Sequence, residues 1–310
     1  MRALVAAVAA LLLITASAHA GVPTATTGGA NTITQTSAKL TGSVKPNKEN
    51  TTWHFEYGPT TAYGTSTPEQ GPVVAGAGNT NVSADVGGLT AGTTYHYRLV
   101  ATNPSGSVPG KDRTFTTRPG VSIATSATTV RFNRSETIKG QVSGSAIGGI
   151  TVTLQENPYP FAGFNDVATT TTDAAGNYQF IRPVTTNTAY RVVAQTRPPG
   201  TSATAFVYEQ DTVSLKVSSS RPRRGRSVLF TGFSQPARVG GPVYVQRLGR
   251  HGWRTVLTAK LAPTTVPNSA SYSIRLKGRK VVSGVYRAYV PGGFDHVAGA
   301  SPTKRITVRR

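Results

Sequence analysis

The sequence predicts an all-β protein of three tandem antiparallel β-sandwich domains. Around residues 94–102 apolar residues alternate with polar ones, and Tyr95, Tyr97 and Leu99 fall on one face of the strand. The 33 glycines and 20 prolines, with a single methionine, suit short strands joined by turns. The last two thirds of the chain also contain a repeat at offsets of 91 to 96 residues, the size of one sandwich.

The first domain is predicted to span residues 21–118. The spacing between Leu89 and Tyr95 is that of a tyrosine corner, in which the phenol bonds to the backbone near Leu89. With the aromatic run 53–57 upstream and Thr114 to Thr117 downstream, the segment resembles a bacterial fibronectin type III domain. That resemblance implies a scaffold and leaves the ligand open. The expected strands are residues 38–44, 52–57, 81–86 and 94–102.

Residues 119–210 and 211–310 are predicted to be two copies of one module. Each copy has a pair of glycines nine residues apart, followed by a strand that ends in glutamine, Gln155 in one copy and Gln246 in the other. Tyr190-Arg191 then matches Tyr286-Arg287. The two copies resemble bacterial immunoglobulin-like modules of surface proteins.

The first 20 residues have the pattern of a secretory signal peptide. A basic start precedes the apolar run 3–14, and Ala18 and Ala20 supply the small-x-small cleavage pattern. The run is shorter than the ~20 residues of a membrane span, and we expect no transmembrane segment elsewhere. We therefore expect a secreted chain that begins near Gly21, and positive charge is one way in which the cell surface could retain it.

The net charge of +21 is concentrated in the last domain. Residues 211–310 contain 19 lysines and arginines and only two carboxylates, Asp211 and Asp295. A surface of one sign favours a polyanionic partner. The alternative is that the arginine excess reflects codon bias together with selection for solubility.

A polyanion-binding face is predicted on one sheet of this domain. If Val243, Tyr286 and Ile306 point inward, alternation turns the neighbouring arginines and tyrosines outward. Arginine alternating with tyrosine can pair with anionic groups and stack on planar or sugar rings. The predicted binding residues are Arg287, Arg305, Arg309, Tyr244 and Tyr289. A secondary basic loop contains Arg221, Arg223, Arg224 and Arg226.

Aromatic residues in the loop 156–164 provide a candidate contact for sugars or apolar ligands. The repeat alignment matches Phe164 with Trp253, so both are expected in the core. Tyr159 and Phe161 have no counterpart in the last domain and are the candidate contact residues.

No catalytic, metal or cofactor site is predicted. The histidines are scattered, and His296 is expected to point away from its neighbour Asp295, as adjacent strand residues do. The loop after Asp173 lacks the spaced oxygen ligands of a calcium site and is expected to be a hairpin turn. The absence of cysteine excludes disulfides and thiolate chemistry.

The sequence thus favours a secreted, non-catalytic binding or adhesion protein. Its basic last domain is expected to attach to an anionic polymer or polysaccharide of the cell envelope, and extracellular nucleic acid stays open as a partner. The alternative is a structural spacer or a protein–protein interaction module.

Overall fold

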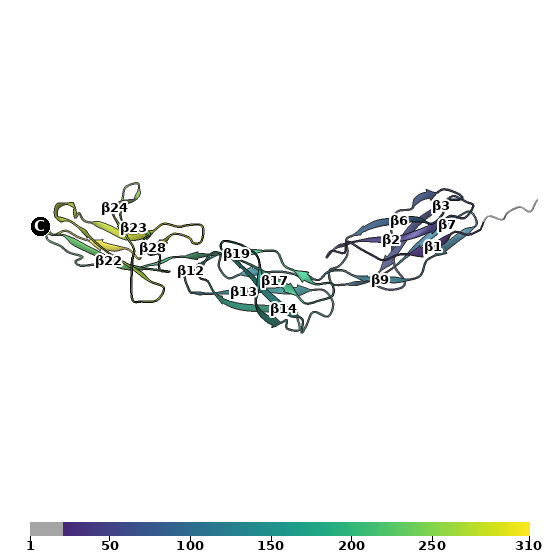
Figure 1. Ribbon diagram of the computed structural model, residues 1–310, viewed down its shortest axis with the longest axis horizontal. Coiled ribbons are helices and arrows are strands. Elements are labelled where there is room, and N and C mark those ends of the chain that lie inside the picture. Colours follow the sequence, from purple (N-terminus) through teal and green to yellow (C-terminus); the bar gives the residue numbers. More distant parts are fainter. Residues whose placement is uncertain (1–20) are drawn as a thin grey trace, which may run out of the picture. The chain divides into compact units, whose positions relative to one another are not determined.

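The computed structural model describes residues 21–310, and the expected signal peptide lies outside the described residues. The described chain is an all-β protein of paired antiparallel sheets with a fibronectin type III or immunoglobulin-like sandwich architecture (Figure 1). It separates into two compact units, one ending at Thr117 and one spanning Arg118–Arg310. The first unit has one hydrophobic core and the second has two. The division into three domains stays a prediction.

The first unit is a two-sheet sandwich, here the N-terminal sandwich. Its strands are β1 (Thr24–Thr27), β2 (Ser37–Lys45), β3 (Thr51–Gly58), β4 (Thr65–Ser66), β5 (Gln70–Val73), β6 (Thr80–Gly87), β7 (Thr94–Asn103), β8 (Gly106–Pro109) and β9 (Arg113–Thr116). One sheet has the order β1-β2-β6, and the other has β4-β3-β7-β8, with β5 paired to β3 and β9 to β7. Alternation along β2, β3 and β7 buries Leu40, Phe55 and Leu99 completely between the sheets.

The expected tyrosine corner is present. The backbone amide of Thr90 donates to the Tyr95 hydroxyl at 2.9 Å, one residue from the expected contact at Leu89. The Tyr95 ring also stacks on Phe115, with 5.7 Å between centroids. The corner therefore fixes the turn before β7 to the start of that strand.

The second unit begins with the middle sandwich. Its strands are β10 (Gly120–Val121), β11 (Ala124–Thr125), β12 (Thr129–Arg131), β13 (Ser135–Ser143), β14 (Thr151–Pro158), β15 (Asn165–Thr171), β16 (Asn177–Pro183), β17 (Thr188–Ala194), β18 (Gly200–Thr201) and β19 (Ala205–Gln210). Strand β13 pairs with β10, β11 and β16 in one layer. The other layer has the order β12-β19-β17-β14-β15, in which β12 and β19 run parallel.

The basic sandwich completes the second unit. Its elements are β20 (Thr212–Val213), β21 (Lys216–Val217), β22 (Val228–Gln235), β23 (Pro242–Gly249), β24 (Gly252–Lys260), β25 (Ala262–Pro263), β26 (Ala270–Leu276), the 3-10 turn η1 (Gly278–Lys280), β27 (Gly284–Val290), β28 (Gly299–Ala300) and β29 (Lys304–Ile306). One sheet has the order β20-β22-β26-β25, with β21 on β22. The other has β24-β23-β27-β28, with β29 on β27.

The first glycine of each repeated pair, Gly140 and Gly232, is required for the same structural reason. Tyr272 lies opposite Gly232 and donates its hydroxyl to the Ser214 carbonyl at 2.6 Å. Tyr178 lies opposite Gly140 and donates to Ser122 in the same way. At either glycine a Cβ atom would collide with the tyrosine hydroxyl and the serine carbonyl, so only glycine fits.

The loop after Asp173 is a turn, but it does not form the expected hairpin. The Asp173 carboxylate accepts hydrogen bonds from the backbone amides of Ala175 and Asn177, at 2.9 and 2.8 Å. The strands it joins, β15 and β16, belong to different sheets. The turn carries the chain across the sandwich rather than back along a neighbour.

The tyrosine corner generates a stability prediction. Tyr95→Phe keeps the ring packed on Phe115 but leaves the Thr90 amide without its acceptor. We expect the free energy of unfolding of residues 21–117 to fall by about 1 kcal/mol, with an unchanged denaturant m-value. Urea unfolding of that unit measures both, and an unchanged midpoint would show that the hydrogen bond contributes nothing to stability.

Candidate polyanion-binding surfaces

A buried ion-pair cluster lies where the middle sandwich meets the basic sandwich. Arg238, in the loop between β22 and β23, donates from Nη2 to Glu209 Oε2 at 2.8 Å and from Nη1 to Asp295 Oδ2 at 2.7 Å. Its Nε donates to the Asp211 carboxylate at 2.8 and 3.0 Å. The Glu209 and Asp211 side chains are fully buried. We call these four residues the junction cluster.

Asn187 reinforces the same junction. Its side chain donates to the Phe294 carbonyl at 2.9 Å and accepts from the Glu209 amide at 2.9 Å. Its backbone amide donates to the Asp295 carbonyl at 2.8 Å. These bonds join β19 of the middle sandwich to the β27–β28 loop of the basic sandwich.

His296 contacts Asp295, which corrects the sequence expectation. The two residues lie in the loop between β27 and β28 rather than in a strand, so alternation does not separate their side chains. His296 Nδ1 is 2.6 Å from Asp295 Oδ1, and Nε2 is 3.1 Å from the Pro291 carbonyl. The histidine is thus an accessory of the junction cluster.

Burial shifts the pKa values of the acidic groups in the junction cluster. Desolvation, reinforced by the neighbouring Asp211 charge, raises the pKa of Glu209 to about 8. Desolvation also raises the pKa of Asp211. The pKa of Asp295 is lowered, because hydrogen bonds from His296 and Arg238 outweigh its partial desolvation. Glu209 Oε1 is buried without a hydrogen-bond partner among the described residues, so Arg238 stabilises only Oε2 of this carboxyl group.

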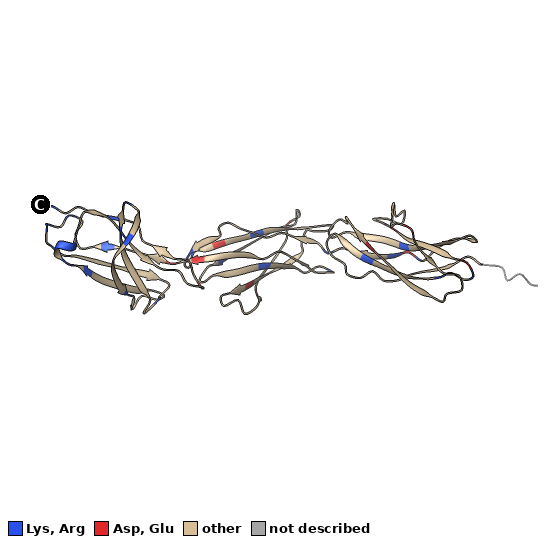
Figure 2. Cartoon of the chain, turned by 90° about the horizontal axis from the view of Figure 1, so that it is seen from above, with Lys and Arg blue, Asp and Glu red and all other residues tan. Residues whose placement is uncertain are grey.

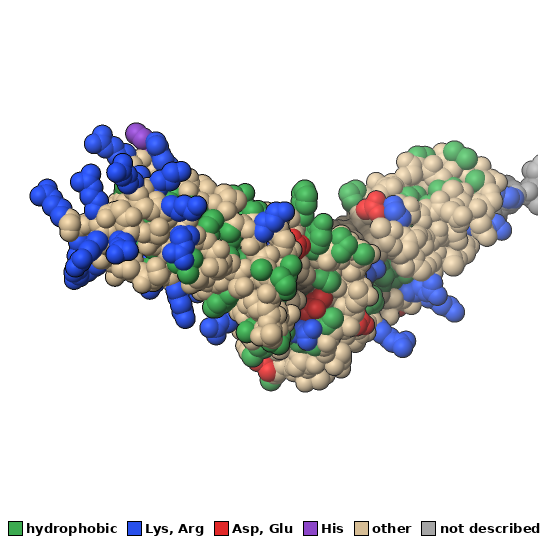
Figure 3. Space-filling view, turned by 60° about the vertical axis from the view of Figure 1, so that its left-hand side comes forward, with side chains coloured by type: hydrophobic (Ala, Val, Ile, Leu, Met, Phe, Trp, Pro, Cys, Tyr) green, Lys and Arg blue, Asp and Glu red, His purple; other side chains and the backbone are tan. Residues whose placement is uncertain are grey.

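The junction cluster leaves the rest of the basic sandwich without counter-charges. Asp211 and Asp295 are the only acidic side chains of residues 211–310, and both pair with Arg238. None of the other 18 lysines and arginines in this range forms an ion pair among residues 21–310. Lys and Arg residues accordingly gather at the C-terminal end of the second unit (Figure 2), and their side chains cover that end in the space-filling view (Figure 3).

The basic loop, the 3-10 turn and the C-terminal segment converge at one end of this sandwich. The Arg309 amide donates to the Pro222 carbonyl and the Arg224 amide to the Arg309 carbonyl, both at 2.9 Å. Ser227 accepts from the Gly278 amide at 3.3 Å. We call the exposed cations of these three segments the tip cluster: Arg221, Arg223, Arg224, Arg226, Lys277, Arg279, Lys280, Arg309 and Arg310.

A shallow hollow of about 890 Å³ lies within the tip cluster. Arg224 and Arg279 line it together with apolar and hydroxyl groups of residues 281–283 and Val308. The Val308 amide donates to the Ser283 hydroxyl at 2.9 Å, which holds the C-terminal segment against the start of β27. The hollow presents guanidinium groups without an opposing carboxylate.

The five residues of the predicted face do not form one group in the structure. Tyr244 and Tyr289 are paired across β23 and β27, with ring centroids 6.4 Å apart and planes at 28°. Arg305 lies opposite Val285, on the same face two residues along β27 from Arg287. Arg309 belongs instead to the tip cluster, because the segment after β29 bridges to Arg223 in the basic loop.

Arg287 is held in a stack that the middle sandwich repeats. Its Nε donates to Gln246 Oε1 at 2.9 Å, and its guanidinium lies over the Trp253 ring, 4.3 Å from the centroid. Desolvation lowers its pKa. Arg191 bonds to Gln155 at 2.6 Å and covers Phe164 at 4.1 Å in the same arrangement.

This repeated stack overturns the expectation that Phe164 and Trp253 fill core positions. Both rings are only partly buried, on the outer sheet face, and each is covered by an arginine instead of the opposite sheet. The two positions are equivalent, as the repeat alignment indicated. The pattern of Gln, Arg and aromatic residue was visible in the sequence, but the β-bulge opposite each glutamine was not. It adds one residue to β15 and to β24 and thereby turns the aromatic side chain outward.

Tyr159 and Phe161 are exposed, at 40% and 41%, and their rings meet edge to face with 5.9 Å between centroids. Phe206 of β19 adds a third exposed ring, 6.2 Å from Phe161. Sequence reasoning missed Phe206, because it lies 45 residues further along the chain. The candidate contact is therefore a three-ring cluster on the middle sandwich.

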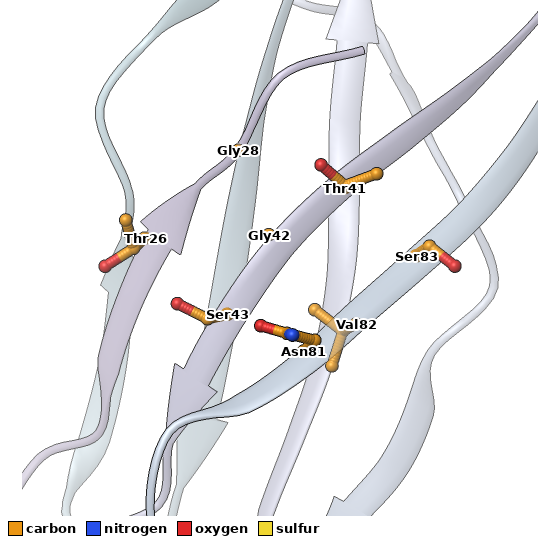
Figure 4. Close-up of a pocket in the computed structure, with 8 residues that line it drawn as sticks. All are labelled: Thr26, Gly28, Thr41, Gly42, Ser43, Asn81, Val82 and Ser83. Carbon is orange, nitrogen blue, oxygen red and sulfur yellow. The ribbon is translucent and has the colours of Figure 1, made fainter. Parts of the chain in front are cut away.

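A hollow of about 450 Å³ on the N-terminal sandwich has different chemistry (Figure 4). It lies over β1, β2 and β6 and is lined by small residues, among them Thr26, Ser43 and Asn81. Its lining contains no charged or aromatic side chain. Its polar side chains are hydroxyls and one amide, and Val82 adds an apolar group, so this lining has no charge that would attract a polyanion.

Comparisons with known proteins add no family. No family model matches the chain, and no curated protein matches it. Among solved structures, the FN1-FN3 domains of chicken CNTN1 are 17% identical, with 92% of this chain and 99% of that chain covered and a TM-score of 0.25. The native conformation of E. coli alpha-2-macroglobulin is 9% identical, with 93% and 23% covered and a TM-score of 0.30. Because both scores lie below 0.5, the sandwich assignment depends on the strand pairing of this chain itself.

Within residues 21–310, no helix is long and apolar enough to cross a membrane.

The junction cluster predicts a pH-dependent stability. Because the folded-state pKa of Glu209 is raised from 4.5 to about 8, folding retains a proton that the unfolded chain releases. This contribution to the free energy of unfolding is complete below about pH 4.5. It is lost as the pH rises to about 8, at about 1.4 kcal/mol per pH unit. Glu209→Gln, neutral at every pH, should flatten the fall in melting temperature of the chain between pH 5 and 8.

The control for this measurement is Asp166→Asn, at an exposed position on β15. It changes the formal charge by the same amount and should leave the pH dependence as in the wild type. If wild type and Glu209→Gln lose melting temperature equally over this range, Glu209 is not the group that titrates.

Proposed function

We propose that this protein is a secreted, non-catalytic binding protein whose basic sandwich attaches to an anionic polymer, at the cell envelope or outside the cell. The observation that carries the proposal is the junction cluster. It uses both carboxylates of residues 211–310 and leaves 18 cations unpaired within the described chain. A surface of one sign raises the local concentration of a polyanion and speeds its association.

The tip cluster is the main electrostatic contact in this proposal. Its nine cations are all exposed, and the three segments that carry them are joined by hydrogen bonds: backbone bonds between the basic loop and the C-terminal segment, and a bond from the 3-10 turn to the Ser227 hydroxyl. Most are arginines, whose planar guanidinium donates to phosphate, sulfate or carboxylate oxygens in pairs.

The other two sandwiches differ in charge pattern. In the N-terminal sandwich Arg98 pairs with Glu56 at 2.6 Å and Lys39 with Asp85 at 2.9 Å. In the middle sandwich Arg182 pairs with Glu156 at 2.7 Å. Mixed, locally neutralised surfaces of this kind suit a spacer, and we assign these parts that role.

If the binding site is localised at the tip cluster, charge reversal there should weaken polyanion binding more than the same reversal elsewhere on the basic sandwich. Replacing Arg223, Arg224 and Arg279 with Glu should weaken polyphosphate binding by about tenfold or more near 0.15 M salt, since charge-assisted contacts are lost. The slope of log affinity against log salt should also become shallower. Fluorescence anisotropy with labelled inorganic polyphosphate on the full chain, titrated with salt, measures both.

The matched control replaces Lys216, Lys260 and Arg275 with Glu, three exposed positions outside the tip cluster. Both triple variants change the net charge by the same amount. Equal losses would show a diffuse field, screened over roughly 8 to 10 Å, without a site at the tip. If neither variant loses affinity, the charge excess is compositional, and the structural spacer or protein–protein module replaces this proposal.

A further inference from the structure

The outer face of the sheet formed by β24, β23 and β27 carries partly exposed aromatic rings. Binding of a polyanion by charge alone would not need them. We propose that the unpaired bases of a single-stranded nucleic acid stack on Tyr244 and Tyr289, while the arginines neutralise its phosphates. This proposal rests on the proposed polyanion attachment. The polymer class is thereby narrowed from polyanions in general to one that has both phosphates and exposed planar rings.

The middle sandwich serves as an internal comparison for these tyrosines. With the Gln-Arg stack as the common reference, Thr153 occupies the position of Tyr244, and Val193 occupies the position of Tyr289. Thr153 and Val193 are paired across β14 and β17, as the tyrosines are across β23 and β27. The same sheet therefore forms without the rings, so the fold does not explain their presence in the basic sandwich.

The rings form part of a continuous strip. The Tyr244 and Tyr289 rings lie 6.4 Å apart at 28°, and the Arg287 guanidinium is 5.4 Å from the Tyr289 centroid and 4.3 Å from the Trp253 centroid. All three rings are only partly buried. Near-parallel ring faces beside a cation are the groups on which bases of any sequence stack.

The strip leads to the tip cluster along a single strand. Going from Tyr289 back along β27, the outer face presents Arg287 and then Val285, beside which Arg305 lies. Residues 281–283, directly before β27, line the hollow at the tip. At about 3.3 Å per residue the path from residue 289 to 283 is about 20 Å long, enough to accommodate several nucleotides with rings at one end and cations at the other.

The ligand must have free ring faces, and this separates it from the other polyanions. Inorganic polyphosphate has no ring, and the bases of a duplex are stacked on one another. An anionic polysaccharide can place the C–H face of a sugar on an aromatic ring, so it is the competing ligand in the test.

The test replaces each tyrosine with the residue that the middle sandwich carries, Tyr244→Thr together with Tyr289→Val, in the full chain. We expect affinity for labelled oligothymidylate to fall by about tenfold or more, because each lost base–ring stack is worth severalfold or more. Affinity for inorganic polyphosphate should change by less than about twofold. Tyr244→Phe with Tyr289→Phe, which keeps the rings, should retain oligothymidylate binding and shows that the phenol hydroxyls are not responsible.

Three outcomes would overturn the proposal. The first is equal oligothymidylate affinity in the wild type and the Thr/Val variant. The second is a loss of polyphosphate binding as large as the loss of oligothymidylate binding, which would indicate a folding or charge defect. The third is an equal loss for a polyuronate, which would assign the rings to sugars.

The experiment also separates failure of the two proposals. If the wild type binds neither oligothymidylate nor polyphosphate, the polyanion attachment itself is wrong. If the wild type binds polyphosphate but the tyrosine substitutions have no effect, only the base stacking is wrong.

Discussion

The junction cluster is the interaction on which the electrostatics of the second unit depend. Arg238 holds three carboxylates at 2.7 to 2.8 Å, and two of them are fully buried. Burying these charges carries a desolvation cost that only close, multiple hydrogen bonds offset. The cluster therefore joins the two sandwiches only in a geometry in which Arg238 donates to all three carboxyl groups. This geometry requires acidic side chains, and it uses both of those that the basic sandwich has.

The unpaired cations elsewhere follow from this arrangement. Where cations and carboxylates share an exposed surface, they pair at little net gain and the surface becomes locally neutral, as Lys39 and Asp85 do on the N-terminal sandwich. On the basic sandwich the acidic side chains are taken up by the junction cluster. Nine of the remaining cations lie together where hydrogen bonds join three segments, at the tip cluster.

The sequence predicted the sandwich fold well, because period-two alternation is a local signal. The alternation at Tyr95, Tyr97 and Leu99, and the spacing from Leu89, was sufficient to place β7 and its corner bond. The predicted inward residues Val243, Tyr286 and Ile306 are at most 1% exposed. Where the chain leaves regular strand geometry, prediction failed: a bulge turns Phe164 and Trp253 outward, and a loop lets Asp295 and His296 meet.

The candidate site was predicted less well, because it depends on which segments converge. Arg309 was grouped with Arg287 by alternation along one strand, whereas the bridge to Arg223 places it in the tip cluster. No local pattern indicates such a bridge between residues 86 positions apart, or shows that Arg238 takes up both carboxylates.

A comparison of the two sandwiches of the second unit distinguishes side chains with a structural role from side chains available for binding. Arg287, Gln246 and Trp253 look like a binding group when the basic sandwich is viewed alone, but the middle sandwich builds the same stack from Arg191, Gln155 and Phe164. A stack found in both copies is explained by the bulged sheet that both share. Side chains that differ between matched positions on an unchanged backbone are not explained in this way. By that criterion the tyrosine pair, rather than Arg287, is the group for which a ligand has to be sought.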